Sequence, residues 1–483
     1  MRYHIVGIAG AGMSAIAHIL LDQGHEAQGS DAQRGPLAAA LERRGALVLQ
    51  GHAAEHVAGA DALVATSAVR DDHVELRAAR ERGIPVLRRA DLWREWSQQR
   101  EVVAVAGTHG KTTTTALIAL ALSRAGVNPG FLVGGEVPDL GTNARWGDPQ
   151  APLVVEADEY ARTFLALAPK LAVITNVEWD HVDIYPTPEE YEAAFRAFAR
   201  SVPDPRRLIV CGDDAGALRA ADEPRAVQYG LDDAVANDPA SCRLAPLDWT
   251  GARVRSEGDR TRFEVWRYSQ ATFATSLLGI YTMRLAGAHN VRNALAAIAA
   301  CTALGVPQDA IRAALEDYRG TKRRFELKGE AGGVTVVDDY AHHPTEARVN
   351  LAAARARFPG RRIVAYLQPH TYSRTAALMD EWAEAFGDAD VVRIGAVYAA
   401  REAEVPGVSA EALARRIRHA DVQPLGGVEQ AAEALLELLR PGDVLLTLGA
   451  GDGYRVGELV LDRLRAPTRT CRGDAGGAPL RNR

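Results

Sequence analysis

The stretch EVVAVAGTHGKTTTT, residues 101–115, decides the fold. Its first six residues are mostly valine and alanine, which predicts a buried strand. The turn that follows ends in Lys-Thr-Thr and opens a helix, and backbone N–H groups in such a turn can hold phosphate oxygens. The alternative is an ordinary helix start capped by threonines, but G-x-x-G-K-T-T directly after a buried strand argues against it. We therefore predict a nucleotide-binding strand–loop–helix unit.

The loop departs from the usual phosphate-binding pattern at one position. The pattern G-x-x-x-x-G-K-[ST] requires a glycine where this chain has Val105. Lys111 is nevertheless placed to reach the β- and γ-phosphates, and Thr112 to bind Mg²⁺. Lys111 is also one of only four lysines among the 56 basic residues, so chemistry that needs a compact ammonium points to it. We expect ATP to be bound by Gly107, Thr108, His109, Gly110, Lys111, Thr112 and Thr113.

On both sides of this unit, short apolar strands alternate with helical patterns, which is typical of α/β proteins. At ~150 residues a domain, a chain of 483 residues has room for about three. We predict an N-terminal Rossmann-like domain (1–97), a central P-loop ATPase-type α/β domain (98–325) and a C-terminal Rossmann-like domain (326–465). Alternation around residues 240–285 predicts a small antiparallel sheet in the central domain. The Arg-, Gly- and Pro-rich tail, 466–483, is expected to be disordered.

Composition excludes several classes of protein. The net charge is −6 with both signs interspersed, so we expect no nucleic-acid partner. The four cysteines show no C-x-x-C spacing, which favours a reducing compartment and argues against a cysteine-rich zinc site. The most apolar segment, 5–21, is broken by glycines and too short to span a bilayer. We expect a cytoplasmic protein without membrane insertion.

A second glycine-rich turn lies at the N-terminus, in GIAGAGMSA. Gly10, Gly12 and Ala15 give G-x-G-x-x-A, and Asp31 follows about 20 residues later, as in dinucleotide sites. The turn could hold NAD or any nucleotide diphosphate, because every tight strand–helix turn needs such glycines. A redox enzyme with a separate ATP domain is an awkward combination. An ATP-driven enzyme with a nucleotide-linked substrate is simpler.

Polar residues follow two predicted strands of the central domain. Glu156 ends the strand in VVEADEY, and Asn176 and His181 follow the strand in VITNVEWDHVD. Ligands of α/β sheets bind at such strand ends. Thr112, Glu156 and His181 could therefore position one or two Mg²⁺ ions around a γ-phosphate.

The third domain carries two similar groups. VVDDYAHHPTE places Asp339, Tyr340, His342 and His343 after one strand, and LQPHTYSRT places His370 and Arg374 after another. Neighbouring side chains on a strand point to opposite faces, so a metal shared by the two adjacent histidines is a poor reading. An arginine flanked by histidines better suits recognition of a small carboxylate.

Together these motifs resemble the Mur ligase family, ATP-dependent enzymes that build the peptide of bacterial peptidoglycan. The resemblance covers nearly the whole chain, and the family's loop G-T-x-G-K-T-[ST] needs no glycine at Val105. It is strongest to the branch that joins L-alanine to UDP-N-acetylmuramate, through DDYAHHPTE (338–346), QPHTYSRT (368–375) and YAAREAEVPGVS (398–409). Other branches carry a carbamylated lysine where this chain has Phe195, and the alanine branch also lacks it. Two departures, Tyr160 after EADE and Ala396 in GAVYAARE, leave details of the metal shell and the third domain open.

The resemblance implies an activated carboxylate: ATP phosphorylates the sugar's carboxylate, and the amine of L-alanine displaces phosphate. It implies a monomer or weak homodimer that uses ATP and Mg²⁺, with third-domain residues moving onto the central domain. The implied catalytic residues are Lys111, Glu156, His181, His343 and Arg374, with Thr112, Glu156 and His181 as metal ligands. Further ATP contacts fall on Asn290, Asn293, Arg324 and Asp339, the UDP-sugar on Gly10, Gly12, Met13, Asp31, His52 and Ser67, and the amino acid on Tyr340, His343, His370 and Arg374.

Three alternatives stay open. A sibling ligase that recycles a tripeptide shares the double-histidine motif. A dinucleotide-dependent oxidoreductase would explain only the N-terminal glycines and Asp31. A non-catalytic, regulatory ATPase would hydrolyse ATP without any UDP-sugar.

Overall fold

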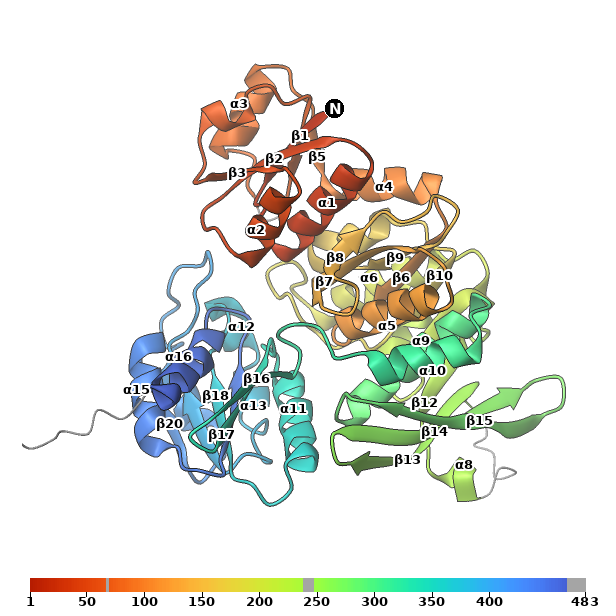
Figure 1. Ribbon diagram of the computed structural model, residues 1–483, viewed down its shortest axis with the longest axis vertical. Helices are drawn as coiled ribbons and strands as arrows, with labels where there is room; N and C mark the ends of the chain where they lie inside the picture. Colours follow the sequence, from red (N-terminus) through yellow and green to blue (C-terminus); the bar gives the residue numbers. More distant parts are fainter. Residues whose placement is uncertain (67–68, 238–246, 467–483) are drawn as a thin grey trace, which may run out of the picture.

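The computed structural model describes residues 1–66, 69–237 and 247–466 of the chain (Figure 1). Ser67, one of the residues expected at the UDP-sugar, lies outside this part, as does the tail beyond Ala466. Three separate sheets follow one another along the chain, with helices packed on them. This is the three-domain α/β architecture that the sequence predicts.

The N-terminal sheet contains five parallel strands in the order β3-β2-β1-β4-β5. This order reverses direction at β1, so the turn after β1 opens at a topological switch point, where nucleotides bind in such sheets. The strands are β1 (Arg2–Val6), β2 (Glu26–Asp31), β3 (Leu47–Gln50), β4 (Ala62–Ala65) and β5 (Val86–Arg88), and the helices are α1 (Ala11–Asp22), α2 (Pro36–Arg43), η1 (Ala54–Val57), α3 (Val74–Glu81) and α4 (Arg89–Gln99).

The central sheet contains ten strands in the order β15-β14-β13-β12-β11-β10-β6-β9-β7-β8. Strands β13 to β15 pair antiparallel with one another, and β13 continues the parallel sheet through β12, so the small antiparallel sheet expected around 240–285 is an extension of the parallel one. The strands are β6 (Val102–Ala106), β7 (Gly130–Val137), β8 (Thr142–Arg145), β9 (Leu153–Glu156), β10 (Leu171–Ile174), β11 (Leu208–Cys211), β12 (Val227–Leu231), β13 (Trp249–Glu257), β14 (Arg260–Ser269) and β15 (Ala274–Met283). The helices are α5 (Lys111–Arg124), η2 (Tyr160–Ala166), α6 (Pro188–Arg200), η3 (Pro205–Arg207), α7 (Ala215–Ala221), α8 (Ala234–Asn237), α9 (Ala288–Ala303) and α10 (Gln308–Asp317).

The C-terminal sheet contains six strands in the order β16-β17-β21-β18-β19-β20, of which only β16 runs antiparallel to its neighbour. The strands are β16 (Glu326–Ala331), β17 (Val334–Asp339), β18 (Ile363–Leu367), β19 (Val391–Ile394), β20 (Val422–Pro424) and β21 (Val444–Leu448). The helices are α11 (Pro344–Arg357), α12 (Tyr372–Ala377), α13 (Met379–Trp382), α14 (Ala410–Arg416), α15 (Val428–Leu438) and α16 (Tyr454–Arg465).

The strand–loop–helix unit of residues 101–115 lies inside the central sheet, where β6 pairs with β9 and β10. All five residues of β6 are fully buried, and α5 is buried from Thr112 to Leu122 because it packs between the sheet and helices α9 and α10. Helix α1 packs on β7 and β8, so the first two domains share one hydrophobic core. No helix in the described residues has the length and apolar character needed to cross a membrane.

Candidate active site

The phosphate-binding loop joins β6 to α5 and needs glycine at two positions. Gly107 and Gly110 have φ angles of +138° and +82°. A Cβ atom on Gly107 would overlap Thr175 Oγ1, and one on Gly110 would overlap Asn293 Oδ1. Val105, in contrast, is a buried β6 residue paired with β9 and β10, so the loop starts after it and has no use for a glycine there.

Lys111 curls back over this loop. Its Nζ donates to the carbonyls of Gly107 and Thr108 at 2.5 and 3.0 Å, and lies 2.8 Å from Glu159 Oε2. Burial lowers the pKa of the Lys111 ammonium, but the nearby carboxylates, Glu159 first, outweigh it and raise that pKa above its ordinary value. The side chain therefore remains a cation beside the loop, as phosphate binding requires.

Two of the three predicted metal ligands lie together. Thr112 Oγ1 donates to Glu156 Oε1 at 2.9 Å, and Gly134 N donates to Glu156 Oε2 at 2.6 Å. Neighbouring oxygens of an octahedral Mg²⁺ shell, each about 2.0–2.1 Å from the ion, are separated by about 2.9 Å. The residues present therefore fit a magnesium ion at the start of α5. Burial raises the pKa of Glu156, and a cation would counteract that effect.

The third predicted ligand, His181, falls in a different group. Its ligand atom lies within 4.8 Å of those of Asp158 and Glu159, and His181 Nε2 is 3.3 Å from Glu159 Oε1. The predicted metal ligands therefore lie in two groups, Thr112 with Glu156 and His181 with Asp158 and Glu159, which is the arrangement that two ions would need. The reason is the backbone: His181 has a φ of +53° and turns its ring toward the EADE loop.

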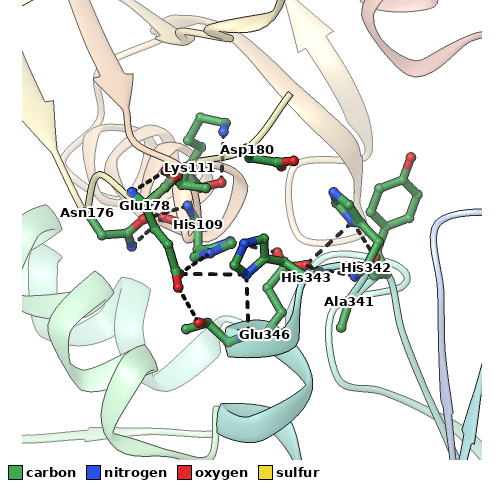
Figure 2. A network of polar contacts seen from close by, with 12 residues as sticks. His109, Lys111, Asn176, Glu178, Asp180, Ala341, His342, His343 and Glu346 are labelled. Atoms are coloured by element: carbon green, nitrogen blue, oxygen red, sulfur yellow. Dashed lines mark hydrogen bonds and ion pairs between the residues drawn. The ribbon is translucent and has the colours of Figure 1, made fainter. Parts of the chain in front are cut away.

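His109 of the loop connects the central domain to the C-terminal domain (Figure 2). Its Nε2 lies 3.0 Å from Glu178 Oε2, and its Nδ1 lies 3.2 Å from Glu346 Oε1 on α11. Thr345 Oγ1, also on α11, donates to Glu178 at 2.6 Å. Burial lowers the pKa of His109, but Glu346 and Glu178 outweigh it and raise that pKa to about 9. The P-loop imidazole is thus a cation between two carboxylates.

Asn176, which follows β10, holds the same loop through two hydrogen bonds. Its side chain accepts from His109 N at 2.8 Å and donates to His109 O at 3.1 Å. The β10 strand end therefore holds the phosphate loop by its backbone, as expected for a residue in the VITN segment.

The side chains of His342 and His343 point in different directions. The two residues do not lie on a strand, contrary to our prediction from the sequence. They occupy the turn between β17 and α11, where His343 is the N-cap of α11 and His342 points to the Tyr340 carbonyl. His343 is 1% exposed, and its ring lies tilted against the His109 ring with the centroids 4.9 Å apart. Its Nε2 has no hydrogen-bond partner among the described residues. No group of candidate metal ligands among the described residues contains both histidines.

Arg374 makes the second contact between these domains. Its Nε donates to Asp180 Oδ1 at 2.7 Å, with His370 Nδ1 and His181 Nδ1 at 3.1 and 3.4 Å from the guanidinium. Burial raises the pKa of the Asp180 carboxyl, yet His181 and Arg374 outweigh it and hold that pKa well below its ordinary value. A carboxylate thus occupies the site where the sequence predicts the carboxylate of an amino acid.

A cavity of about 250 Å³ opens beside the phosphate loop, between the central and C-terminal domains. Its walls include the predicted nucleotide contacts Asn290, Asn293, Arg324 and Asp339. Asp339 accepts from Phe325 N and Ala341 N, both at 2.7 Å. Burial, opposed by Arg324, raises the pKa of Asp339 to about 7. Tyr340 lies outside these walls, with its ring against Arg323 and Arg324.

The described residues among those predicted to bind the UDP-sugar lie at or after the carboxyl ends of β1 to β3. Gly10 is the N-cap of α1, Gly12 approaches Arg89, and Asp31 accepts from Ala9 N at 3.0 Å. The side chain of Met13 is 5% exposed because α1 packs it against the sheet, so a ligand here would meet the backbone of Met13. His52 follows β3, and its Nδ1 lies 3.1 Å from the Ser30 hydroxyl.

Four residues of the site carry no sequence prediction: Glu159, Glu178, Asp180 and Glu346. All are carboxylates, and each partners a predicted lysine, histidine or arginine. Glu159 had a local signal, since it follows Glu156 in the EADE run. Glu178 and its partner His109 both belong to the central domain, whereas Asp180 and Glu346 gain their partners only when the central and C-terminal domains come together.

Comparison with known proteins follows the same division into three parts. Profiles described as Mur ligase family, catalytic domain, as Mur ligase middle domain, and as Mur ligase, glutamate ligase domain match residues 2–101, 105–301 and 323–451. The chain is 72% identical over 465 residues to a UDP-N-acetylmuramate–L-alanine ligase of Roseiflexus sp. (strain RS-1), covering 96% of this chain and 99% of that protein. It is 55% identical to the enzyme of that name from Chloroflexus aggregans, covering 96% and 98%.

Solved structures of two ligases are also similar to this chain over nearly its whole length. The UDP-N-acetylmuramate-alanine ligase MurC of Thermotoga maritima superposes with a TM-score of 0.78 at 27% identity, covering 96% of this chain and 99% of that one. A murein peptide ligase of Psychrobacter arcticus superposes with a TM-score of 0.71 at 25% identity, covering 96% and 98%.

Proposed function

Because the chain belongs to the Mur ligase family, we propose that it joins L-alanine to UDP-N-acetylmuramate at the expense of ATP, as a step of peptidoglycan synthesis. The observation that carries this proposal is the match to curated enzymes of that activity over nearly the full length of both chains. The products are UDP-N-acetylmuramoyl-L-alanine, ADP and inorganic phosphate.

The reaction begins with activation of a carboxylate. A sugar carboxylate oxygen attacks the γ-phosphorus of ATP, the bond from that phosphorus to the β,γ-bridging oxygen breaks, and ADP leaves an acyl phosphate behind. Lys111, bound in the free protein to loop carbonyls and Glu159, would transfer its charge to the β- and γ-phosphates. Backbone N–H groups at the start of α5 would hold the same oxygens.

Mg²⁺, when bound with ATP, supplies charge neutralisation at the transferring phosphoryl group. Thr112 and Glu156 would hold that ion, since their oxygens already have the spacing it needs. His181, with Asp158 and Glu159, would hold a second ion nearer the acyl phosphate.

The second step forms the amide. The neutral amine of L-alanine attacks the acyl carbon, and the tetrahedral intermediate expels phosphate and loses a proton. Arg374, flanked by His370 and with His343 nearby, would bind the alanine carboxylate. The hydrogen bond from Arg374 to the carboxylate of Asp180 supports this role. Alanine would therefore displace Asp180 when it binds.

We also propose the setting of this reaction. The domains 1–97, 98–325 and 326–465 would bind the UDP-sugar, ATP and the amino acid, with Asn290 and Asn293 near the adenine and Asp339 near the ribose. The enzyme would act in the cytoplasm as a monomer or weak homodimer. In support, the two cysteines in the described residues, Cys211 and Cys301, are buried free thiols.

Phosphate release tests the proposal. The protein is incubated with ATP, Mg²⁺ and UDP-N-acetylmuramate, and L-alanine, glycine, L-serine, D-glutamate or a tripeptide is added in turn. We expect release only when the UDP-sugar and L-alanine are both present, with glycine and serine as the nearest competitors because one methylene changes binding by only ~1–3 kcal/mol. Release with ATP alone would indicate a regulatory ATPase, and release only with the tripeptide would assign the chain to the recycling branch.

A further inference from the structure

A buried glutamate of the N-terminal domain is surrounded by histidines. Glu75, at the start of α3, is fully buried, and its carboxylate faces His4 on β1, His52 after β3, and His56 in η1. His73, the N-cap of α3, lies beside His52 with ring centroids 4.7 Å apart. Apart from His52, expected at the UDP-sugar, no step of the ligase reaction uses these side chains.

The spacing of these atoms is that of ligands around one ion. His52 Nδ1 and His4 Nε2 lie 3.5 and 3.4 Å from the same oxygen, Glu75 Oε2. Two ligands of a tetrahedral ion, each about 2.0–2.2 Å from it, are separated by about 3.4 Å. Ligand atoms of His52, His73 and Glu75 all lie within 4.8 Å of one another.

One atom of the cluster is unsatisfied. His4 is fully buried, and its Nε2 has no hydrogen-bond partner within the described ranges although it faces Glu75. Its contact with Glu75 Oε2 is long, at 3.4 Å, and an ion between the two atoms would give this buried nitrogen a closer partner. The Ser30 hydroxyl lies between His52 Nδ1 and Glu75 Oε2, at 3.1 and 2.6 Å, and must rotate away when an ion enters.

We propose that His52, His73 and Glu75 form a binding site for a divalent transition-metal ion of the Zn²⁺ class, with His4 Nε2 facing the same carboxylate oxygen. Two imidazoles and one carboxylate suit Zn²⁺ and Co²⁺, whereas Mg²⁺ takes mainly oxygen ligands and disfavours a group rich in imidazoles. The site is therefore distinct from the magnesium site at Thr112 and Glu156. His52 is partly exposed, with 29% of its side chain accessible, which gives the ion a way in.

The position of this site predicts its consequence. Ser30 precedes Asp31, and His52 follows β3 at the strand ends where we place the UDP-sugar. An ion bound by His52 would therefore hinder the UDP-sugar. This consequence rests on the proposed function, whereas metal binding itself does not.

Calorimetric titration of Zn²⁺ into the full-length, chelator-treated protein, without substrates and with millimolar Mg²⁺ present, tests the site. We expect one equivalent to bind at micromolar concentration, and Co²⁺ to give the visible absorption of a tetrahedral site. His73→Asn should weaken binding at least tenfold while keeping α3 intact, because asparagine is itself a good N-cap. Glu75→Gln should weaken it further, and His25→Asn, a partly exposed histidine of the same domain outside the cluster, should leave it unchanged.

Two results would overturn the proposal. One is the absence of a binding heat with Zn²⁺ and of a Co²⁺ spectrum in the folded wild-type protein. The other is binding that is equally tight in His73→Asn and in wild type, which would move the ion to another group such as His109, Glu178 and His343. Neither result would bear on ligase activity measured with Mg²⁺.

Discussion

Individual side chains of the site are held in pairs of opposite charge. Lys111 is paired with Glu159, and His109 with Glu178 and Glu346. All except Glu178, whose side chain is 39% exposed, are largely withdrawn from solvent. Removing one member of such a pair leaves the other buried and unpaired, which costs about 3–5 kcal/mol. Single substitutions here therefore change stability as well as chemistry, and experiments must separate the two effects.

Lys111→Ala should reduce phosphate release by at least about a hundredfold, because the charge on the β- and γ-phosphates loses its partner. The same change leaves Glu159, which is 1% exposed, buried without its cation, and should lower the melting temperature. Lys111→Ala combined with Glu159→Gln should recover the melting temperature. Near-normal turnover in the single variant would refute the role given to Lys111, and thermal unfolding of both variants provides the control.

The pKa of His109, raised to about 9, predicts a pH dependence of stability. Protonated His109 is favoured by folding, so its contribution is complete below the unfolded pKa near 6.5 and is lost as the pH rises to about 9. The melting temperature of wild type minus that of His109→Asn should be larger at pH 6.5 than at pH 9.5, by about 2–4 °C for each kcal/mol. A difference in melting temperature between wild type and His109→Asn that stays constant or grows with pH would contradict the ion pair.

At the scale of elements, sequence patterns predicted what lies close together in the chain. The β6–loop–α5 unit could be predicted because strand, glycines, lysine and threonines are contiguous. The strand-end residues Glu156 and Asn176 could be predicted because parallel strands bring their carboxyl ends to one edge. Asp180 and Glu346 could not be, since their partners Arg374 and His109 come from another domain and no local periodicity encodes that contact.

Helix α6 offers a test at this scale. Phe195, at the position where sibling ligases carry a lysine, is fully buried and lies 5.1 Å from the rings of both Phe164 and Tyr191. Phe195→Ala should destabilise the protein by about 3–5 kcal/mol, because it leaves a cavity in an aromatic cluster. Phe273→Ala, at a phenylalanine that is 79% exposed, is the matched control and should leave the melting temperature unchanged. Equal melting temperatures for both variants would contradict this packing.

At the scale of the whole molecule, the C-terminal domain closes the site made by the central domain. Glu346 and Thr345 of α11 contact His109 and Glu178, and Arg374 of α12 contacts Asp180. The nucleotide cavity has walls from both domains. Because these contacts involve the phosphate loop directly, motion of the C-terminal domain should be coupled to ATP binding and to alanine binding.

Arg374→Lys tests the amino-acid side of this interface. It keeps the charge paired with Asp180 but loses the fork geometry that suits a carboxylate. The KM for L-alanine should rise at least about tenfold, while the KM for ATP changes by less than about threefold. The opposite pattern, a raised KM for ATP with an unchanged KM for L-alanine, would show that Arg374 serves the nucleotide.

The addition of L-alanine by this chain is tested most directly by a competition between L-alanine and the tripeptide. The protein is given ATP, Mg²⁺, UDP-N-acetylmuramate and equal concentrations of L-alanine and the tripeptide, and the UDP-sugar products are separated by mass. We expect UDP-N-acetylmuramoyl-L-alanine to predominate from the earliest time points. A product carrying mainly the tripeptide, or an unmodified sugar despite phosphate release, would contradict it.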